Sequence, residues 1–192
     1  MKRIKTHTPK GTRIITREEE SKMVALLRCP DHYAERSYYA DVADLVEVMA
    51  DTGMRLGELL ELRKEDISFE KSFITVRVTK YHPRRVPMTR RVVAVLKRRH
   101  EVGHDKPFGF NQHQIHRAWS WAREKIGIEG ADRLILYSLR KSCVQRLIDA
   151  GVEPEILYAW LGFAAIGKER RSPHLPLHKL TAAAEMLDAT SK

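Results

Sequence analysis

The chain has 192 residues, of which 43% are hydrophobic and 31% charged, as expected of a globular domain with its own core. No apolar run is long enough to span a bilayer, and Cys29 and Cys143 are too few and too far apart for a disulfide framework or a zinc pair. The excess of 35 Lys and Arg over 25 Asp and Glu gives a net charge of +10, which favours a polyanionic partner such as nucleic acid.

Helices are predicted for the first third of the chain. Residues 1–15 are basic and contain Pro and Gly, so we expect an irregular arm or linker. A capping box formed by Thr16 and Glu19 opens a helix that runs to about residue 27. Apolar residues at helical spacing predict a second helix over 36–52, and a third helix follows it directly.

The next segment has the alternating pattern of strands. Residues 73–79 predict one strand, 81–85 a turn and 85–88 a short partner strand. Helical periodicity then predicts helices beginning at Thr89 and over 112–126, 138–150, 154–161 and 177–187. No internal repeat occurs, so the pattern indicates one mainly helical α+β domain with a small antiparallel sheet.

Three stretches of the chain resemble the motifs of a single family. They are ADTGMRLGELLELRKEDI (Ala50 to Ile67), ITVRVTKYHPRRVPMT (Ile74 to Thr89) and LYSLRKSCVQRLIDAGVEPEILYAWLGF (Leu136 to Phe163). In order and spacing they resemble the first arginine motif, the β-hairpin and the second arginine motif of the tyrosine recombinases, or phage integrases. The resemblance runs from about residue 13 to 187 and implies an integrase-like catalytic domain over 16–192, preceded by the arm at 1–15.

The resemblance also implies a chemistry. In this family a tyrosine attacks the scissile phosphate to form a 3′-phosphotyrosyl link, while two arginines stabilise the transition state and a lysine protonates the leaving 5′ oxygen. No metal or other cofactor is needed. By resemblance, Arg55 and Arg140 form the phosphate clamp, Lys80 is the acid, and Glu58, one helical turn beyond Arg55, orients the clamp.

Three family positions are substituted. Tyr137 stands where the family usually has His, Phe163 where it has His or Trp, and Ser172 where it has the nucleophilic Tyr. Phe163 has no polar hydrogen, and an aliphatic hydroxyl has a far higher pKa than a phenol. The sequence therefore predicts a chain that binds double-stranded DNA but does not cut it.

Further basic residues lie on segments that line the DNA groove in the family, and they are candidate DNA contacts. They are Arg84, Arg85, Arg90, Arg91, Lys141, Lys168, Arg170 and Arg171. Because such contacts are made to phosphates, we expect binding that weakens steeply with salt. A protein of this kind is expected in the cytoplasm, associated with the nucleoid, and without a membrane partner.

Two alternatives remain open at this point. The chain could be an active recombinase in which the tyrosine was deliberately replaced by Ser172. It could instead be a protein-interaction module on the same fold, which binds another copy of itself or a cutting recombinase through its C-terminal helix. That docking face would contain Leu177, Leu180, Met186 and Leu187, which could equally belong to the core.

Overall fold

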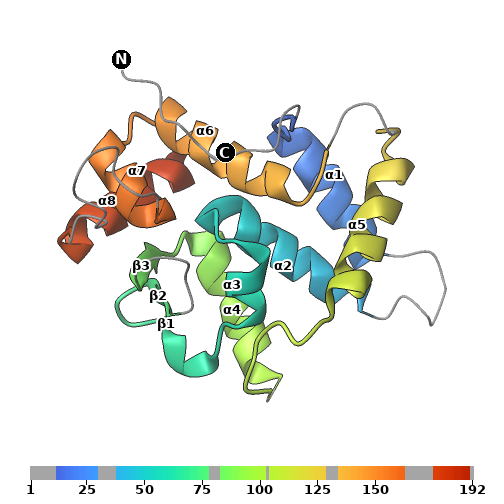
Figure 1. Cartoon of the computed structure of the whole chain (residues 1–192), viewed down its shortest axis with the longest axis horizontal. Helices are drawn as coiled ribbons and strands as arrows, with labels where there is room; N and C mark the ends of the chain where they lie inside the picture. The colour runs from blue at the N-terminus through green and yellow to red at the C-terminus, as the bar shows by residue number, and fades with distance from the viewer. Residues whose placement is uncertain are drawn as a thin grey trace.

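The computed structural model describes residues 12–29, 38–77, 83–102, 104–128, 134–162 and 175–190. In these ranges the chain forms eight α-helices, a 3₁₀ turn and one three-stranded sheet (Figure 1). The elements are α1 (Arg17–Arg28), α2 (Tyr39–Thr52), α3 (Leu56–Leu60), η2 (Lys64–Asp66), β1 (Ile67–Ser68), β2 (Phe73–Val76), β3 (Arg84–Pro87), α4 (Arg90–Glu101), α5 (Gln112–Lys125), α6 (Tyr137–Asp149), α7 (Pro154–Leu161) and α8 (Leu177–Ala189). The predicted mainly helical α+β fold is confirmed.

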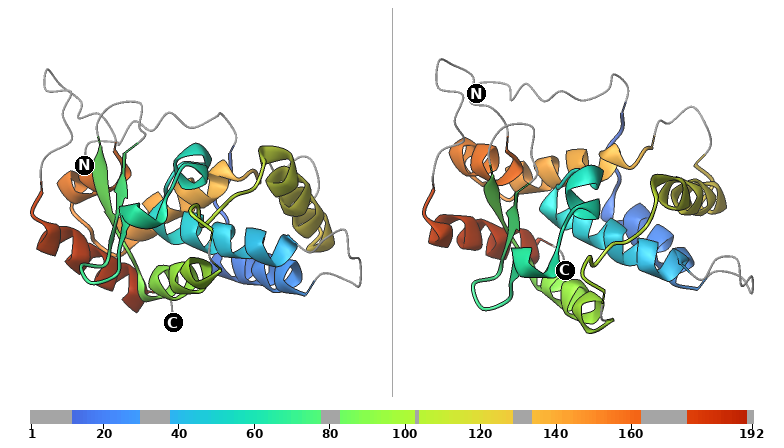
Figure 2. Two further views of the ribbon diagram at one scale, coloured as in Figure 1. Left: turned by 90° about the horizontal axis from the view of Figure 1, so that it is seen from below. Right: turned by 60° about the horizontal axis from the view of Figure 1, so that its bottom comes forward.

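Helix α2 is the centre of the domain. Eleven of its 14 residues are buried, because α1, α4 and α6 all pack against it (Figures 1 and 2). The helix ends at Gly53, whose φ of 61° is in the left-handed region. A Cβ at Gly53 would lie 2.7 Å from Leu161 Cδ2, so neither the backbone nor the space accepts a side chain here. The end of α2 is therefore a fixed point, and α3 begins from it.

The sheet is antiparallel, in the order β1-β2-β3. Ile74 of β2 pairs with Ile67 on one side and with Val86 on the other, and the side chains of Ile74 and Val86 are buried. Strand β3 packs against α7 and α8. The sequence predicted β2 and β3 but not β1, which at two residues is too short to show a period. Arg84, expected in the turn, is the first residue of β3.

Helix α8 packs against β3, α6 and α7 of its own chain. Its buried side includes Leu180 and Leu187, so two of the four residues considered for docking a partner belong to the core of this domain. Leu177 is partly buried against the same core, while Met186 is 40% exposed. The position of α8 thus agrees with the core interpretation of these residues.

Residues 12–15, the described part of the expected arm, are irregular but not detached. Ile15 is buried, its N–H donates to Ser142 Oγ over 2.8 Å, and its carbonyl accepts from Arg146. The carbonyl of Thr12 accepts from Lys141. Residues 12–15 are therefore bound along α6. No helix in the described ranges is both long and apolar enough to cross a membrane.

Candidate functional site

Arg55 is held by Glu58 at the start of α3. The Arg55 backbone N–H donates to Glu58 Oε2 and its Nη1 donates to Oε1, both over 2.9 Å. This reciprocal contact fixes the arginine relative to the helix, as a capping box does. The Glu58 side chain is only 5% exposed, whereas that of Arg55 is 37% exposed. Glu58 is thus not a surface charge, and Arg55 still reaches solvent.

Arg84 approaches the same carboxylate from β3. Its Nη1 and Nη2 donate to Glu58 Oε1 and Oε2 over 2.9 and 2.7 Å, and its Nε donates to the carbonyl of Trp160 over 2.9 Å. The Arg84 side chain is 3% exposed. The sequence suggested this residue as a DNA contact, but the structure places it inside the domain.

Arg140 is the most deeply buried of the three arginines, at 1% exposed. From α6 its Nη1 donates to the carbonyl of Gly53 and its Nη2 to the carbonyl of Leu161, over 2.5 and 2.8 Å. Arg140 therefore joins the turn that carries Arg55 to the end of α7. The two arginines expected to form the clamp lie in one cluster.

The cluster has more positive than negative charge. Burial raises the pKa of Glu58, but hydrogen bonds and charge from Arg84 and then Arg55 outweigh it and bring the pKa to about 2. Burial lowers the pKa of Arg140 to about 10, and the charges of Arg55 and Arg84 add to that effect. Arg55 and Arg84 thus share the one carboxylate of Glu58, while Arg140 adds a third positive charge nearby. An anion of charge −1 or −2 beside Arg55 and Arg140 would relieve the repulsion between them.

Tyr137 begins α6, one helical turn before Arg140. It is half-buried, and its phenol interacts electrostatically with Arg140. Like the histidine usual in the family, a tyrosine can donate a hydrogen bond.

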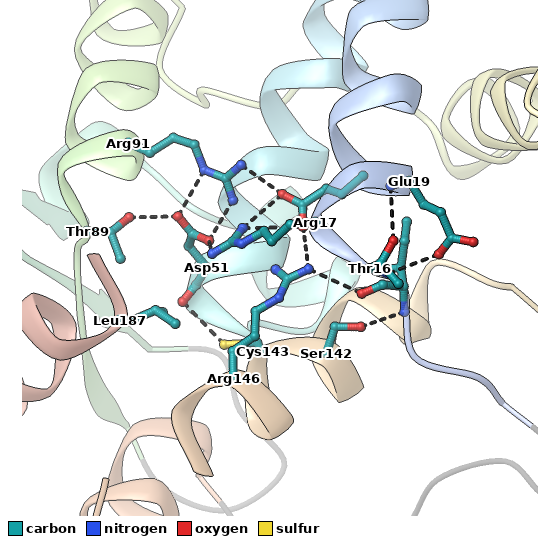
Figure 3. A network of polar contacts seen from close by, with 12 residues as sticks. Thr16, Arg17, Glu19, Asp51, Thr89, Arg91, Ser142, Cys143, Arg146 and Leu187 are labelled. Atoms are coloured by element: carbon teal, nitrogen blue, oxygen red, sulfur yellow. Dashed lines mark hydrogen bonds and ion pairs between the residues drawn. The ribbon is translucent and has the colours of Figure 1, made fainter. Parts of the chain in front are cut away.

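A second charged network surrounds Asp51 near the end of α2 (Figure 3). The buried carboxylate of Asp51 accepts from Thr89 Oγ1 over 2.9 Å and from Arg91 over 2.6 and 2.9 Å, and it pairs with Arg17 over 2.9 Å. Glu20, also buried, pairs with Arg17, Arg91 and Arg146. The network joins α1, α2, α4 and α6, so it fixes α2 just before Arg55.

Sequence reasoning missed this network, although a signal for Glu20 was present. Glu20 shares one helical face with Met23, Val24 and Leu27, at spacings of three, four and seven residues. A carboxylate on an apolar face indicates a buried partner of opposite charge. Asp51 gave a weaker signal, because the polar Thr52 follows it at the helix end.

The other suggested DNA contacts do not all gather at the cluster. Arg85 is exposed next to Arg84, with its guanidinium 5.1 Å from the centroid of the Phe73 ring. Arg90 is exposed and pairs with Asp188 of α8 over 3.7 Å, while Arg91 belongs to the network of Asp51. Lys141 donates to the carbonyl of Thr12. Six further residues lie outside the described ranges: Lys80, Phe163, Lys168, Arg170, Arg171 and Ser172.

Metal ligands do not gather among the described residues. None of their His, Cys, Asp and Glu side chains form a group of three or more that could hold a metal ion. Cys143 is buried and Cys29 is exposed.

Residues 14–174 match the model of the phage integrase family, and the chain belongs to this family. It is 26% identical over 164 residues to the tyrosine recombinase XerA of Pyrococcus furiosus, covering 79% of this chain and 54% of that protein. It is 28% identical over 123 residues to a tyrosine recombinase of Thermosipho africanus, covering 61% of this chain and 44% of that protein. The chain thus spans about half the length of these curated relatives.

Solved structures show the same fold. The crystal structure of XerA recombinase superposes with a TM-score of 0.64 at 20% identity, over 97% of this chain and 60% of that one. XerH recombinase bound to its difH substrate gives a TM-score of 0.65 at 19% identity, over 92% of this chain and 55% of that one. The Tn1549 transposon integrase in complex with transposon right end DNA gives a TM-score of 0.62 at 20% identity, over 95% of this chain and 67% of that one.

Proposed function

We propose that the chain is the DNA-binding domain of an integrase-family protein, which holds a backbone phosphate of duplex DNA at Arg55 and Arg140 and does not cut the strand. The observation that carries the proposal is the charge of the cluster, in which Arg55 and Arg84 share the carboxylate of Glu58 and Arg140 adds a third positive charge nearby. Solved relatives bound to DNA support the choice of ligand. A protein with this function works in the cytoplasm, on the chromosome or on a mobile element.

The phosphate would be recognised by two different kinds of contact. Arg55 is exposed enough to offer its remaining donors to a phosphate oxygen directly. Arg140 is held by two carbonyls, so it contributes a fixed positive charge. Both Tyr137 and Arg140 lie in the first turn of α6, where the helix dipole also favours an anion.

The absence of cutting follows from chemistry at positions 163 and 172. A seryl hydroxyl is a poor nucleophile unless a base activates it, and phenylalanine in place of histidine supplies none. Binding and cleavage are therefore separated in this chain. The basic site retains affinity for the phosphate, while position 172 lacks the family's nucleophilic tyrosine.

Cleavage can be tested with nicked duplexes of randomised sequence, in which a covalent protein–DNA adduct is trapped and seen on a denaturing gel. We expect no adduct from the wild-type chain, and none from Ser172→Tyr, because Phe163 and Tyr137 remain substituted. An adduct from the wild-type chain would disprove the proposal. An adduct from Ser172→Tyr alone would show that only the nucleophile is missing, as in a deliberately trapped recombinase.

A further inference from the structure

We infer that Arg84 is a positioning residue, which fixes Glu58 and through it aligns the Arg55 guanidinium for a phosphate. The inference rests on the proposed binding of DNA. It gives Arg84 a different role from that of its neighbour Arg85, although both are arginines on strand β3.

Burial excludes Arg84 as a direct contact in this conformation. Its side chain is 3% exposed, and each of its three nitrogens has an acceptor within the domain, Glu58 for two and the carbonyl of Trp160 for one. To reach DNA it would have to leave Glu58 as a buried, half-paired carboxylate, which is costly. Arg84 therefore stays in place when the domain binds.

The shape of the guanidinium group explains why an arginine is needed. Arg84 contacts both oxygens of Glu58 side by side, so the carboxylate cannot rotate. The same two oxygens then meet Arg55 in a fixed manner, Oε1 at Nη1 and Oε2 at the backbone N–H. A lysine would supply the charge at a single point and leave the rotation of Glu58 free.

Arg84 also has an electrostatic effect on Arg55. If Glu58 were paired with Arg55 alone, the two charges would cancel and an incoming phosphate would gain little. Because Arg84 shares the carboxylate, the trio of Arg55, Glu58 and Arg84 retains a net charge of +1.

Arg84 packs closely against Gly162 at the end of α7. A Cβ at Gly162, where φ is 66°, would lie 2.9 Å from Arg84 Cδ and 3.1 Å from its Nε. The absence of a side chain at the end of α7 thus leaves the space that Arg84 occupies. One buried side chain connects β3, α3 and the end of α7.

A double-mutant cycle separates positioning from direct contact. Binding to a 20-base-pair duplex of mixed sequence is measured for Arg84→Met and for Arg85→Met, each alone and combined with Arg55→Ala. A residue that acts through Arg55 loses its effect once Arg55 is gone. We expect Arg84→Met to weaken binding on the order of tenfold alone but less than about twofold in the Arg55→Ala background. Arg85→Met should have the same effect in both backgrounds.

Arg84→Lys serves as the second variant, since removal of a buried arginine can unfold the domain. It keeps the charge and loses the fork, and circular dichroism establishes that it is folded. We expect binding on the order of tenfold weaker than wild type, again without further loss in the Arg55→Ala background. If Arg84→Lys binds as tightly as the wild type, or if it loses as much affinity with Arg55→Ala as without it, the inference is overturned but the proposed function is not. A wild-type chain that binds no duplex DNA would overturn the proposed function and this inference with it.

Discussion

The indole N–H of Trp160 donates to the carbonyl of Thr52 over 2.8 Å, which joins α7 to the turn that carries Arg55. The carbonyls on either side accept in the same way, that of Asp51 from the Cys143 thiol and that of Gly53 from Arg140. Three consecutive carbonyls at the end of α2 are thus satisfied by side chains of α6 and α7. Arg55 lies two residues after Gly53, so its backbone is set by contacts from distant parts of the sequence.

Trp160→Phe should weaken both the fold and the binding of DNA. The buried carbonyl of Thr52 would lose its partner, which costs about 1–3 kcal/mol and releases the turn. Trp119→Phe is the matched control, because the buried indole of Trp119 donates over 3.2 Å to the carbonyl of Leu134, away from this turn. Urea unfolding should show losses for both variants. A loss of duplex affinity confined to Trp160→Phe would support the role of the turn, and equal losses would contradict it.

Two glycines near Arg55 should respond oppositely to alanine. Gly53→Ala places a Cβ 2.7 Å from Leu161 Cδ2 at a φ of 61°, and should destabilise the domain by about 1–3 kcal/mol. Gly57 is exposed in α3 with nothing within 4 Å of its virtual Cβ, so Gly57→Ala should stabilise the domain by up to about 1 kcal/mol. Thermal melts of the two variants would decide, and a stabilised Gly53→Ala would refute the close packing described here.

The domain should lose stability in acid. The pKa of Glu58 is about 2 in the folded chain, below its ordinary value of 4.5, so its ionised form favours folding above pH 4.5 and this stabilisation is lost as the pH falls toward 2. Burial raises the pKa of Asp51, but Arg91 and then Arg17 outweigh it and hold the pKa below its usual value, which acts in the same direction. Urea midpoints measured from pH 7 to 2 should fall most below pH 4.5. Glu58→Gln should start lower at pH 7 and fall less, and a slope equal to that of the wild type would contradict the assignment.

The two cysteines should react very differently. Burial raises the pKa of Cys143 to about 12, with Asp51 acting in the same direction, so almost no thiolate exists at neutral pH. Cys29 is exposed after α1. A thiol reagent should therefore modify one cysteine per native chain and two after denaturation. Rapid modification of both in the native state would show that the contact between α6 and the end of α2 opens readily.

Local signals in the sequence predicted most elements of the fold. Examples are the capping box at Thr16, the left-handed Gly53 and the apolar periods of α2 and α7. Each of these signals involves only residues that are close together in the sequence, so it can be recognised without the tertiary structure. Arg55, Glu58 and Arg140 were singled out from the family motifs, and the structure places them in one cluster.

The sequence could not predict which charged side chains pair with residues far away in the chain. Arg84 and Arg85 have the same chemistry and adjacent positions, and only the alternation of β3 against α7 buries one and exposes the other. Arg91 likewise resembles a surface cation at a helix start, yet it closes a network with Asp51 and Glu20 from two other helices. Such roles depend on which elements pack together.

The central claim is that Arg55 still binds a DNA phosphate, and a salt titration tests it most directly. Duplex affinity is measured against salt concentration for the wild type, Arg55→Ala and the control Arg63→Ala, whose side chain is 55% exposed at the start of η2. We expect steep salt dependence for the wild type, a slope smaller by about 1 for Arg55→Ala, and an unchanged slope for Arg63→Ala. If Arg55→Ala binds with the affinity and slope of the wild type, the cluster does not hold DNA and the account is wrong.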